Sequence, residues 1–138
     1  GEYNVLMRSF LKSWQFILLF LIFILANFAL ALYFRLYYLF WWLDIAHHFL
    51  GGLWLAFLLN FYLKKTDFTA SNLLLLLLLF LGFAALAGVL WELGEFIWNR
   101  YIWYSGYRLP NIYATYEDTL SDLFFDLLGV AFGLLLIL

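Results

Sequence analysis

Residues 72–98 read NLLLLLLLFLGFAALAGVLWELGEFIW, and this stretch decides the class of the protein. It is longer than the roughly 20 apolar residues that a helix needs to cross a bilayer, and its charged residues are limited to Glu92 and Glu95. Three further apolar runs, at about residues 14–33, 40–63 and 120–138, are also long enough at a rise of about 1.5 Å per residue. The sequence therefore predicts an all-α integral membrane protein, a four-helix bundle.

The composition agrees with a chain whose main solvent is lipid. Of 138 residues, 68% are hydrophobic and 12% charged, and the net charge is -2, which is too little charge for the surface of a small soluble domain. The absence of Cys excludes disulfides, thiolate catalysis and zinc-thiolate sites. The seven Lys and Arg residues are scattered, so the sequence predicts no nucleic-acid partner and a membrane lipid environment.

The chain divides into an N-terminal tail, residues 1–13, and a single transmembrane domain, residues 14–138. We expect helices at about residues 14–34, 40–63, 71–98 and 118–138. The connection 99–117 is the longest and is rich in Tyr and Trp, which favour the membrane-water boundary. Met7 is the only Met, so we expect it to be the native start and part of the tail to be an addition.

The orientation follows from the positions of Lys and Arg. The end with the N-terminus and the Lys64-Lys65 turn carries four of them, and the other end carries three: Arg35, Arg100 and Arg108. Cytoplasmic loops are enriched in these residues. The count favours both termini in the cytoplasm of a bacterial-type cytoplasmic (inner) membrane, with the opposite face outside.

Polar residues gather at that opposite face. Successive helices alternate in direction, so the start of the second helix, the end of the third and the start of the fourth lie together. Both histidines and six of the nine acids occupy these positions: Asp44, His47, His48, Glu92, Glu95, Asp118, Asp122 and Asp126. Helical spacing places each group on a stripe that continues into small residues such as Gly51, Gly88, Gly129 and Gly133. Small residues mark packed faces in membrane helices, so the polar side chains are predicted to point into the bundle.

A bound cation is the preferred way to neutralise these acids. Each charge costs roughly 2.5–3.5 kcal/mol within a membrane helix. Shared protons or the arginines are the alternatives, but the arginines lie at helix ends or in the long connection. Imidazole with carboxylates suits Zn, Mn or Fe, and carboxylates alone suit Mg. We predict a divalent-metal site with these ligands: Asp44, His47, Glu92, Asp118, Asp122 and Asp126.

Other members of the group are assigned catalytic roles. We predict His48 and Glu95 as acid or base groups and Arg100 as a residue that holds a phosphate. The adjacent histidines lie about 100° apart on the helix, so one is expected to bind the metal while the other orients a carboxylate or binds substrate. Asp118 has a helix cap as its alternative role.

These residues resemble the VanZ-like membrane proteins and the related YjdF-like inner-membrane proteins. The resemblance covers about residues 40–135 and rests on Asp44-Ile45-Ala46-His47-His48, on Trp91-Glu92 with Glu95, and on the segment from Asp118 to Gly129. It implies a helical bundle and a polar site at Asp44, His47 or His48, Glu92, Asp118, Asp122 and Gly129. VanZ-like proteins are associated with low-level resistance to teicoplanin, so the resemblance implies a resistance role and no specific reaction.

Three functions fit the pattern. The first is a metal-dependent enzyme, a hydrolase or transferase, acting on a lipid or lipid-linked substrate at headgroup depth. The second is a non-catalytic binding, assembly or resistance protein pinned by its metal. The third is a proton- or cation-coupled transporter, or a channel formed by a homo-oligomer. The other half of each helix is almost wholly apolar, which argues against a path through one subunit.

Overall fold

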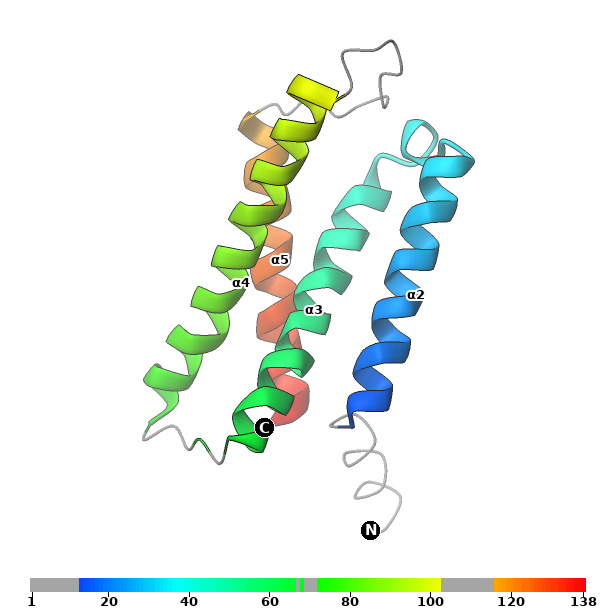
Figure 1. Cartoon of the computed structure of the whole chain (residues 1–138). Coiled ribbons are helices and arrows are strands. Elements are labelled where there is room, and N and C mark those ends of the chain that lie inside the picture. The colour runs from blue at the N-terminus through cyan, green and yellow to red at the C-terminus, as the bar shows by residue number, and fades with distance from the viewer. Residues whose placement is uncertain (1–12, 67, 69–71, 103–115) are drawn as a thin grey trace.

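The computed structural model describes residues 13–66, 68, 72–102 and 116–138, and all regular structure within them is helical. Four long helices are each long and apolar enough to cross a membrane: α2 (Trp14–Tyr33), α3 (Trp42–Lys65), α4 (Leu73–Ile97) and α5 (Tyr116–Ile137) (Figure 1). Two short elements join them at one end, the 3₁₀ turn η1 (Leu36–Tyr38) and the π-helical turn η2 (Trp98–Ile102). The predicted all-α membrane bundle is confirmed.

Local sequence sets several helix ends. The side chain of Ser13 accepts a hydrogen bond from the backbone N–H of Phe16, and Asn72 does the same for Leu75 at 2.8 Å, so polar caps begin α2 and α4. The chain turns from α2 to α3 through Arg35, whose φ of 56° is left-handed. The fourth helix begins at Tyr116, slightly earlier than predicted, which places Asp118 in its first turn instead of at a cap.

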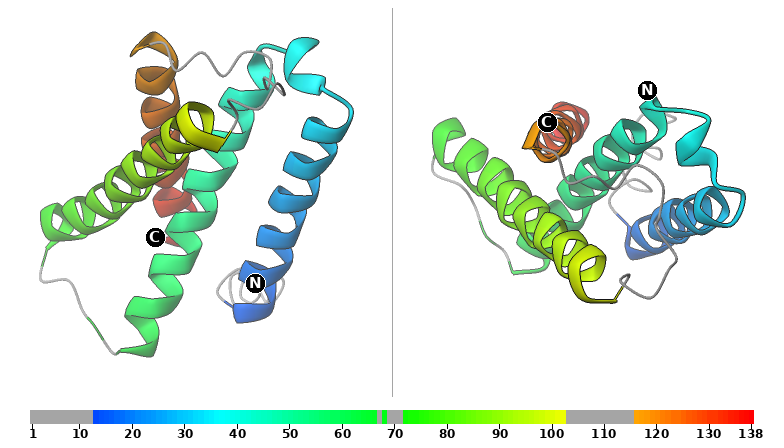
Figure 2. Two further views of the ribbon diagram at one scale, coloured as in Figure 1. Left: turned by 45° about the horizontal axis from the view of Figure 1, so that its top comes forward. Right: turned by 90° about the horizontal axis from the view of Figure 1, so that it is seen from above.

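The parallel pair α3 and α5 forms the centre of the bundle, with α4 packed mainly on α5 and α2 mainly on α3 (Figure 2). Two glycines allow this close approach. A Cβ at Gly52 would collide with the backbone carbonyl of Asp126, and a Cβ at Gly129 would collide with that of Phe49. The two backbones therefore touch, as small residues allow in membrane helices.

The bundle has an apolar half and a polar half. The apolar half, at the end where α2 begins and α5 ends, contains the hydrophobic core of Ala56, Phe80, Ala84, Val130 and Leu134. Several of the leucines that begin α4 point outward, and Leu73, Leu74 and Leu78 are all more than half exposed. Such a surface suits lipid rather than water.

The outermost helix, α2, contacts the rest of the bundle in both halves, and its hydrogen bond to α3 lies in the apolar half. The indole N–H of Trp54 donates to the backbone carbonyl of Ile17 at 2.9 Å, and the rings of Phe16 and Phe57 meet edge-on with centroids 5.2 Å apart. Toward the polar half, Phe28 is the residue of α2 that reaches across, with its ring centroid 5.9 Å from that of Trp91 on α4.

Candidate functional site

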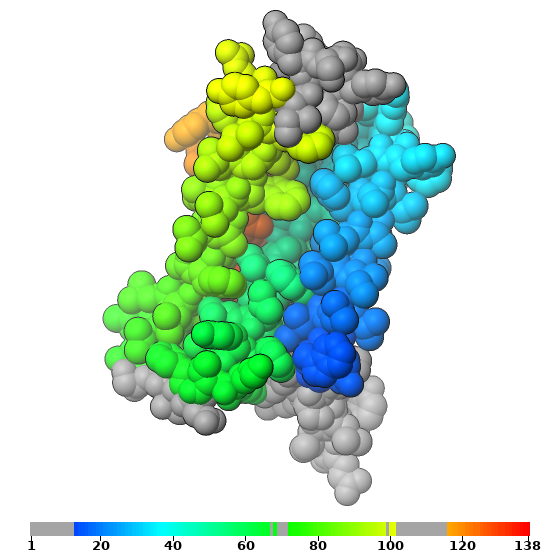
Figure 3. All heavy atoms as spheres, in the orientation of Figure 1, coloured from blue at the N-terminus to red at the C-terminus, as the bar shows by residue number. Residues whose placement is uncertain are grey.

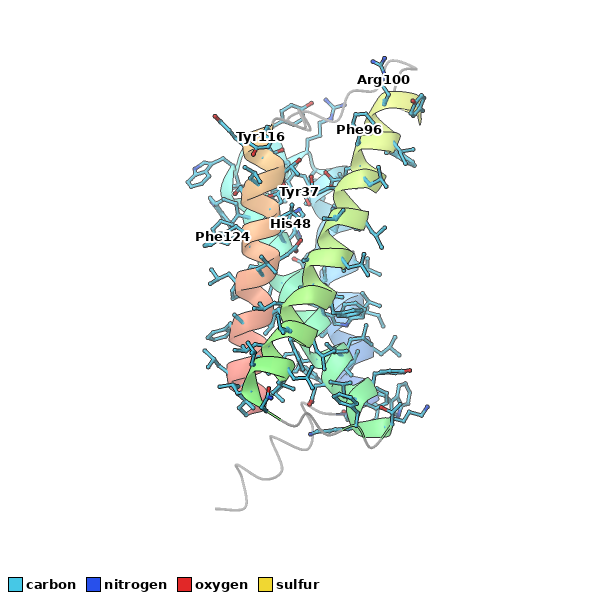
Figure 4. The ribbon with its side chains drawn as sticks, turned by 90° about the vertical axis from the view of Figure 1, so that its left-hand side faces the viewer. Tyr37, His48, Phe96, Arg100, Tyr116 and Phe124 are labelled. Carbon is cyan, nitrogen blue, oxygen red and sulfur yellow. The ribbon has the colours of Figure 1, made fainter. Side chains whose placement is uncertain are left out.

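One buried histidine lies at the centre of the polar half. His48 of α3 is 7% exposed and lies in the part of the bundle between α4 and α5, below Tyr37 (Figure 4). Carboxylate oxygens from three helices surround its ring. Oxygens of Asp44 and Glu92 each lie 4.0 Å from Nε2, and an oxygen of Asp122 lies 3.8 Å from it. An oxygen of Asp126 lies 3.3 Å from the other ring nitrogen, Nδ1.

Three of these side chains have the geometry of a metal-ligand set. Asp44, His48 and Asp122 each offer one ligand atom, and these atoms lie within 4.8 Å of one another. Ligand atoms around a tetrahedral zinc lie about 3.4 Å apart, since each is roughly 2.1 Å from the metal. The donor set of one imidazole and two carboxylates fits a divalent cation, after side-chain movements of about 1 Å that bring the donors together.

Glu92 of α4 lies beside this set. Its Oε2 accepts a hydrogen bond of 2.8 Å from the hydroxyl of Thr119, which fixes the carboxylate. Its Oε1 is buried and has no hydrogen-bond partner among the described residues, although it lies 4.0 Å from His48 Nε2. A buried, unsatisfied carboxylate oxygen is costly, so this atom is suited to a cation.

Asp126 holds the other side of the histidine ring. Its Oδ1 lies 3.3 Å from Nδ1 of His48, and the residue is 6% exposed. A carboxylate on one ring nitrogen fixes the orientation of the imidazole and directs the other nitrogen to its ligand. In this geometry Asp126 positions His48, whereas it was predicted to be a metal ligand.

Four other predicted site residues lie outside the three-ligand set. His47, predicted to be a ligand, shares a hydrogen bond of 3.0 Å with the hydroxyl of Tyr37, whereas His48 lies in the three-ligand set. Glu95 accepts a hydrogen bond of 2.7 Å from the Trp91 indole. Asp118 is half-buried one turn before Asp122. Arg100 is exposed on η2, at the far end of α4 (Figure 4).

Two supporting polar residues of the site, Tyr37 and Thr119, were not predicted from the sequence. Thr119 was detectable, because it precedes Asp122 and Asp126 by three and seven residues and so shares their stripe. Tyr37 lies in the connection between two helices, where no periodicity applies. Burial raises the pKa of its hydroxyl above the usual range, and the carboxylates of Asp44 and Glu95 raise it further, so the hydroxyl stays protonated.

A cavity of about 230 Å³ adjoins the cluster between α2, α3 and α4. Its polar end is formed by Asp44, His47, His48, Glu95 and Asp126. Its remaining walls are almost entirely apolar. The cluster is therefore accessible from a cavity that is polar at one end and apolar along the rest of its length.

The comparison with protein families agrees with the fold. A family model described as "Predicted membrane protein (DUF2238)" matches residues 3–138. The chain belongs to the DUF2238 family. No curated protein and no solved structure matches it. The match covers nearly the whole chain and confirms that this DUF2238 protein is a membrane protein, a broader statement than the resemblance to VanZ-like and YjdF-like proteins.

Proposed function

We propose that this DUF2238 protein binds a divalent metal and uses it as an enzyme, in hydrolysis or group transfer on a lipid or lipid-linked substrate. The observation that carries the proposal is the convergence of three carboxylates, from α3, α4 and α5, on Nε2 of the buried His48. Side chains from separate helices meet there, and one of their oxygens is buried without a hydrogen-bond partner in the described part of the chain.

Charge balance supports a cation at this point. A protonated His48 would carry one positive charge, against four surrounding carboxylates. Arg35 and Arg100 are both exposed, and among the described residues no ion pair joins either to the cluster. Buried acids without counter-charge are strongly unfavourable in a membrane helix, and a divalent ion would offset two of these four negative charges, one more than a protonated His48 does.

The site residues have two roles in this proposal: some would bind the metal, and Glu95 would transfer protons. Asp44, His48 and Asp122, with Glu92, would hold the metal, and mixed imidazole and carboxylate donors suit zinc, manganese or iron better than magnesium. The bound metal supplies Lewis acidity toward a phosphoryl or acyl oxygen, or a water of lowered pKa. Glu95 faces the adjoining cavity, where it can accept or return a proton.

The depth of the cluster supports a substrate whose reactive part is a headgroup. His48 lies six residues after the first residue of α3, and Asp122 six after that of α5, so both are about 9 Å below the helix ends at 1.5 Å per residue. A lipid presents its phosphate or ester near this boundary. Arg100, exposed at the end of α4, is placed to contact a phosphate outside the cluster.

The cellular setting forms part of the same proposal. The four-to-three distribution of Lys and Arg supports an inner-membrane protein with both termini in the cytoplasm and the site on the outer side. The resemblance to VanZ-like proteins supports a role in resistance to compounds that act on that side. The orientation is tested by whether cysteines introduced next to the site react with an impermeant thiol reagent in intact cells.

Metal analysis of purified protein tests the proposal directly. The wild type, exposed to zinc and manganese and then desalted, is expected to retain a stoichiometric metal, and Asp122→Asn is expected to lose it. Glu117→Gln is the matched control, because Glu117 is an exposed acid in the first turn of the same helix. A metal-free wild type, or equal retention by Asp122→Asn and wild type, would refute the site.

A structural role for the metal is the second candidate, favoured because the donors come from three helices. In the apolar half, α4 and α5 share a core, whereas in the polar half a hydrogen bond from Thr119 to Glu92 links them. A metal there would pin α4 to the α3–α5 pair. Chelation that lowers the unfolding temperature, with no turnover of any lipid in a membrane extract, would favour a structural role of the metal over a catalytic one.

A further inference from the structure

The cavity beside the cluster opens toward the lipid. Figure 3 shows this face of the molecule hollowed between α2 and α4, with α5 visible behind. Apolar residues of three helices line the body of the cavity, among them Leu21, Ile24 and Leu25 of α2, Leu55 of α3 and Ala87 of α4. The hollow between α2 and α4 opens sideways between two contacts of α2, the hydrogen bond from Trp54 to Ile17 and the ring contact of Phe28 with Trp91.

The cavity is bounded at both ends. Near the middle of the bundle it ends at Trp54, whose indole is hydrogen-bonded to α2. At the polar end Phe28 covers it, with its ring centroid 6.0 Å from that of His47 and 5.9 Å from that of Trp91. From Asp44 to Leu55 the helix rises about 16 Å, or roughly half of a 30 Å hydrocarbon core. The cavity therefore spans the depth of one leaflet.

We infer that the cavity holds one acyl chain of a membrane phospholipid, which enters sideways between α2 and α4 and brings its phosphate toward Asp44, His48 and Asp122. The headgroup end of this inference rests on the proposed function, because a phosphate would be repelled by these acids without the metal. A volume of about 230 Å³ is below that of pockets that enclose a whole drug-sized ligand, about 300–1,000 Å³, so the cavity is too small for a complete lipid and would enclose part of one acyl chain.

The chemistry of the walls favours a chain over a peptide. An inserted peptide segment would bring backbone N–H and C=O groups that need partners, and the apolar walls supply none. An acyl chain makes no such demand. Its one polar end, in turn, matches the one polar end of the cavity.

Photo-crosslinking tests the inference in the full-length chain. The protein is reconstituted in vesicles of phosphatidylethanolamine and phosphatidylglycerol that contain a phospholipid with a diazirine midway along one acyl chain. After irradiation, adducts are mapped by mass spectrometry. We expect adducts within residues 51–55 of α3, on Gly51, Trp54 and Leu55, which line the cavity behind α2 and α4.

Two variants fill the cavity from opposite walls, and one variant serves as control. Ala87→Phe from α4 and Leu21→Trp from α2 are each expected to abolish the adducts on residues 51–55. Gly82→Phe is the matched control, because a Cβ at Gly82 of the same helix α4 meets nothing within 4 Å. It is expected to leave these adducts unchanged.

The outcomes separate this inference from the proposed function. Adducts confined to outward-facing residues such as Leu86 and Leu90, or adducts on residues 51–55 that persist in both cavity-filling variants, overturn the inference. Metal content is measured on the same samples. A wild type that binds metal without cavity adducts contradicts the inference alone, whereas cavity adducts in a metal-free wild type support the chain site and contradict the proposed function.

Discussion

The backbone contact between α3 and α5 allows a quantitative prediction for Gly52→Ala. The added Cβ would lie 2.9 Å from the carbonyl carbon of Asp126 and 3.1 Å from its Cα, and closer still to the carbonyl oxygen. Carbon atoms are most favourably separated by about 3.5–4.0 Å, so the helices must part by roughly 0.6 Å or more. A side chain could rotate away, but a helix backbone cannot.

The cost of this separation follows from the packing that it loosens. A gap of about 0.5–1 Å forfeits a quarter to a half of the dispersion energy of each contact along the interface. Overpacked cores lose about 1–3 kcal/mol, and an obstacle made of backbone belongs at the upper end. We therefore expect Gly52→Ala to lower the free energy of unfolding by about 3 kcal/mol.

Unfolding in detergent, followed by circular dichroism against denaturant or temperature, measures this change. Gly82→Ala is the matched control, because it makes the same substitution within a helix where the Cβ meets open space. Alanine favours the helix over glycine by up to about 1 kcal/mol, so the control is expected to be neutral or slightly stabilised. A Gly52→Ala variant as stable as this control would refute the backbone contact and the bundle geometry built on it.

Three further predictions concern single polar contacts. In Gly88→Ala the added Cβ would lie 2.6 Å from Oδ2 of Asp126, so the carboxylate must turn. Calorimetric titration should then show weakened zinc binding, and the unfolding temperature should be nearly unchanged. Thr119→Val removes the hydroxyl that fixes Glu92 and should weaken zinc binding about 10-fold or more, while equal affinity would mean that Glu92 is no ligand. Asn60→Leu removes a buried amide nitrogen without a hydrogen-bond partner among the described residues, and unfolding should show unchanged stability or a gain of about 1–3 kcal/mol. A clear loss of stability would contradict that account.

The four helices and their polar end were predictable because each depends on a strong, local signal. Residues 72–98 are too apolar and too long for any other element, and the same holds for the other runs. Alternating direction then brings Asp44, Glu92 and Asp122 to one end, and the structure places all three around His48. Neither step requires knowledge of side-chain packing.

The central histidine could not be chosen from the sequence alone. His47 and His48 precede Gly51 and Gly52 by the same four residues, so helical spacing offers two equivalent stripes. The choice depends on which glycine touches α5, and the structure selects Gly52. The stripe that includes Gly52 is the buried one, so His48 faces inward and His47 turns toward Tyr37 instead.

The central packing contact and the candidate site share one surface. Asp126 positions the ring of His48 with its side chain and touches Gly52 with its backbone carbonyl. Because the backbones of α3 and α5 already touch at this level, the helices cannot move closer to a small ion. The contraction of about 1 Å that a tetrahedral zinc requires must therefore come from rotation of Asp44 and Asp122. A half-exposed Asp44 is free to make that movement, so we expect it to shift more than the buried Asp122 when metal binds.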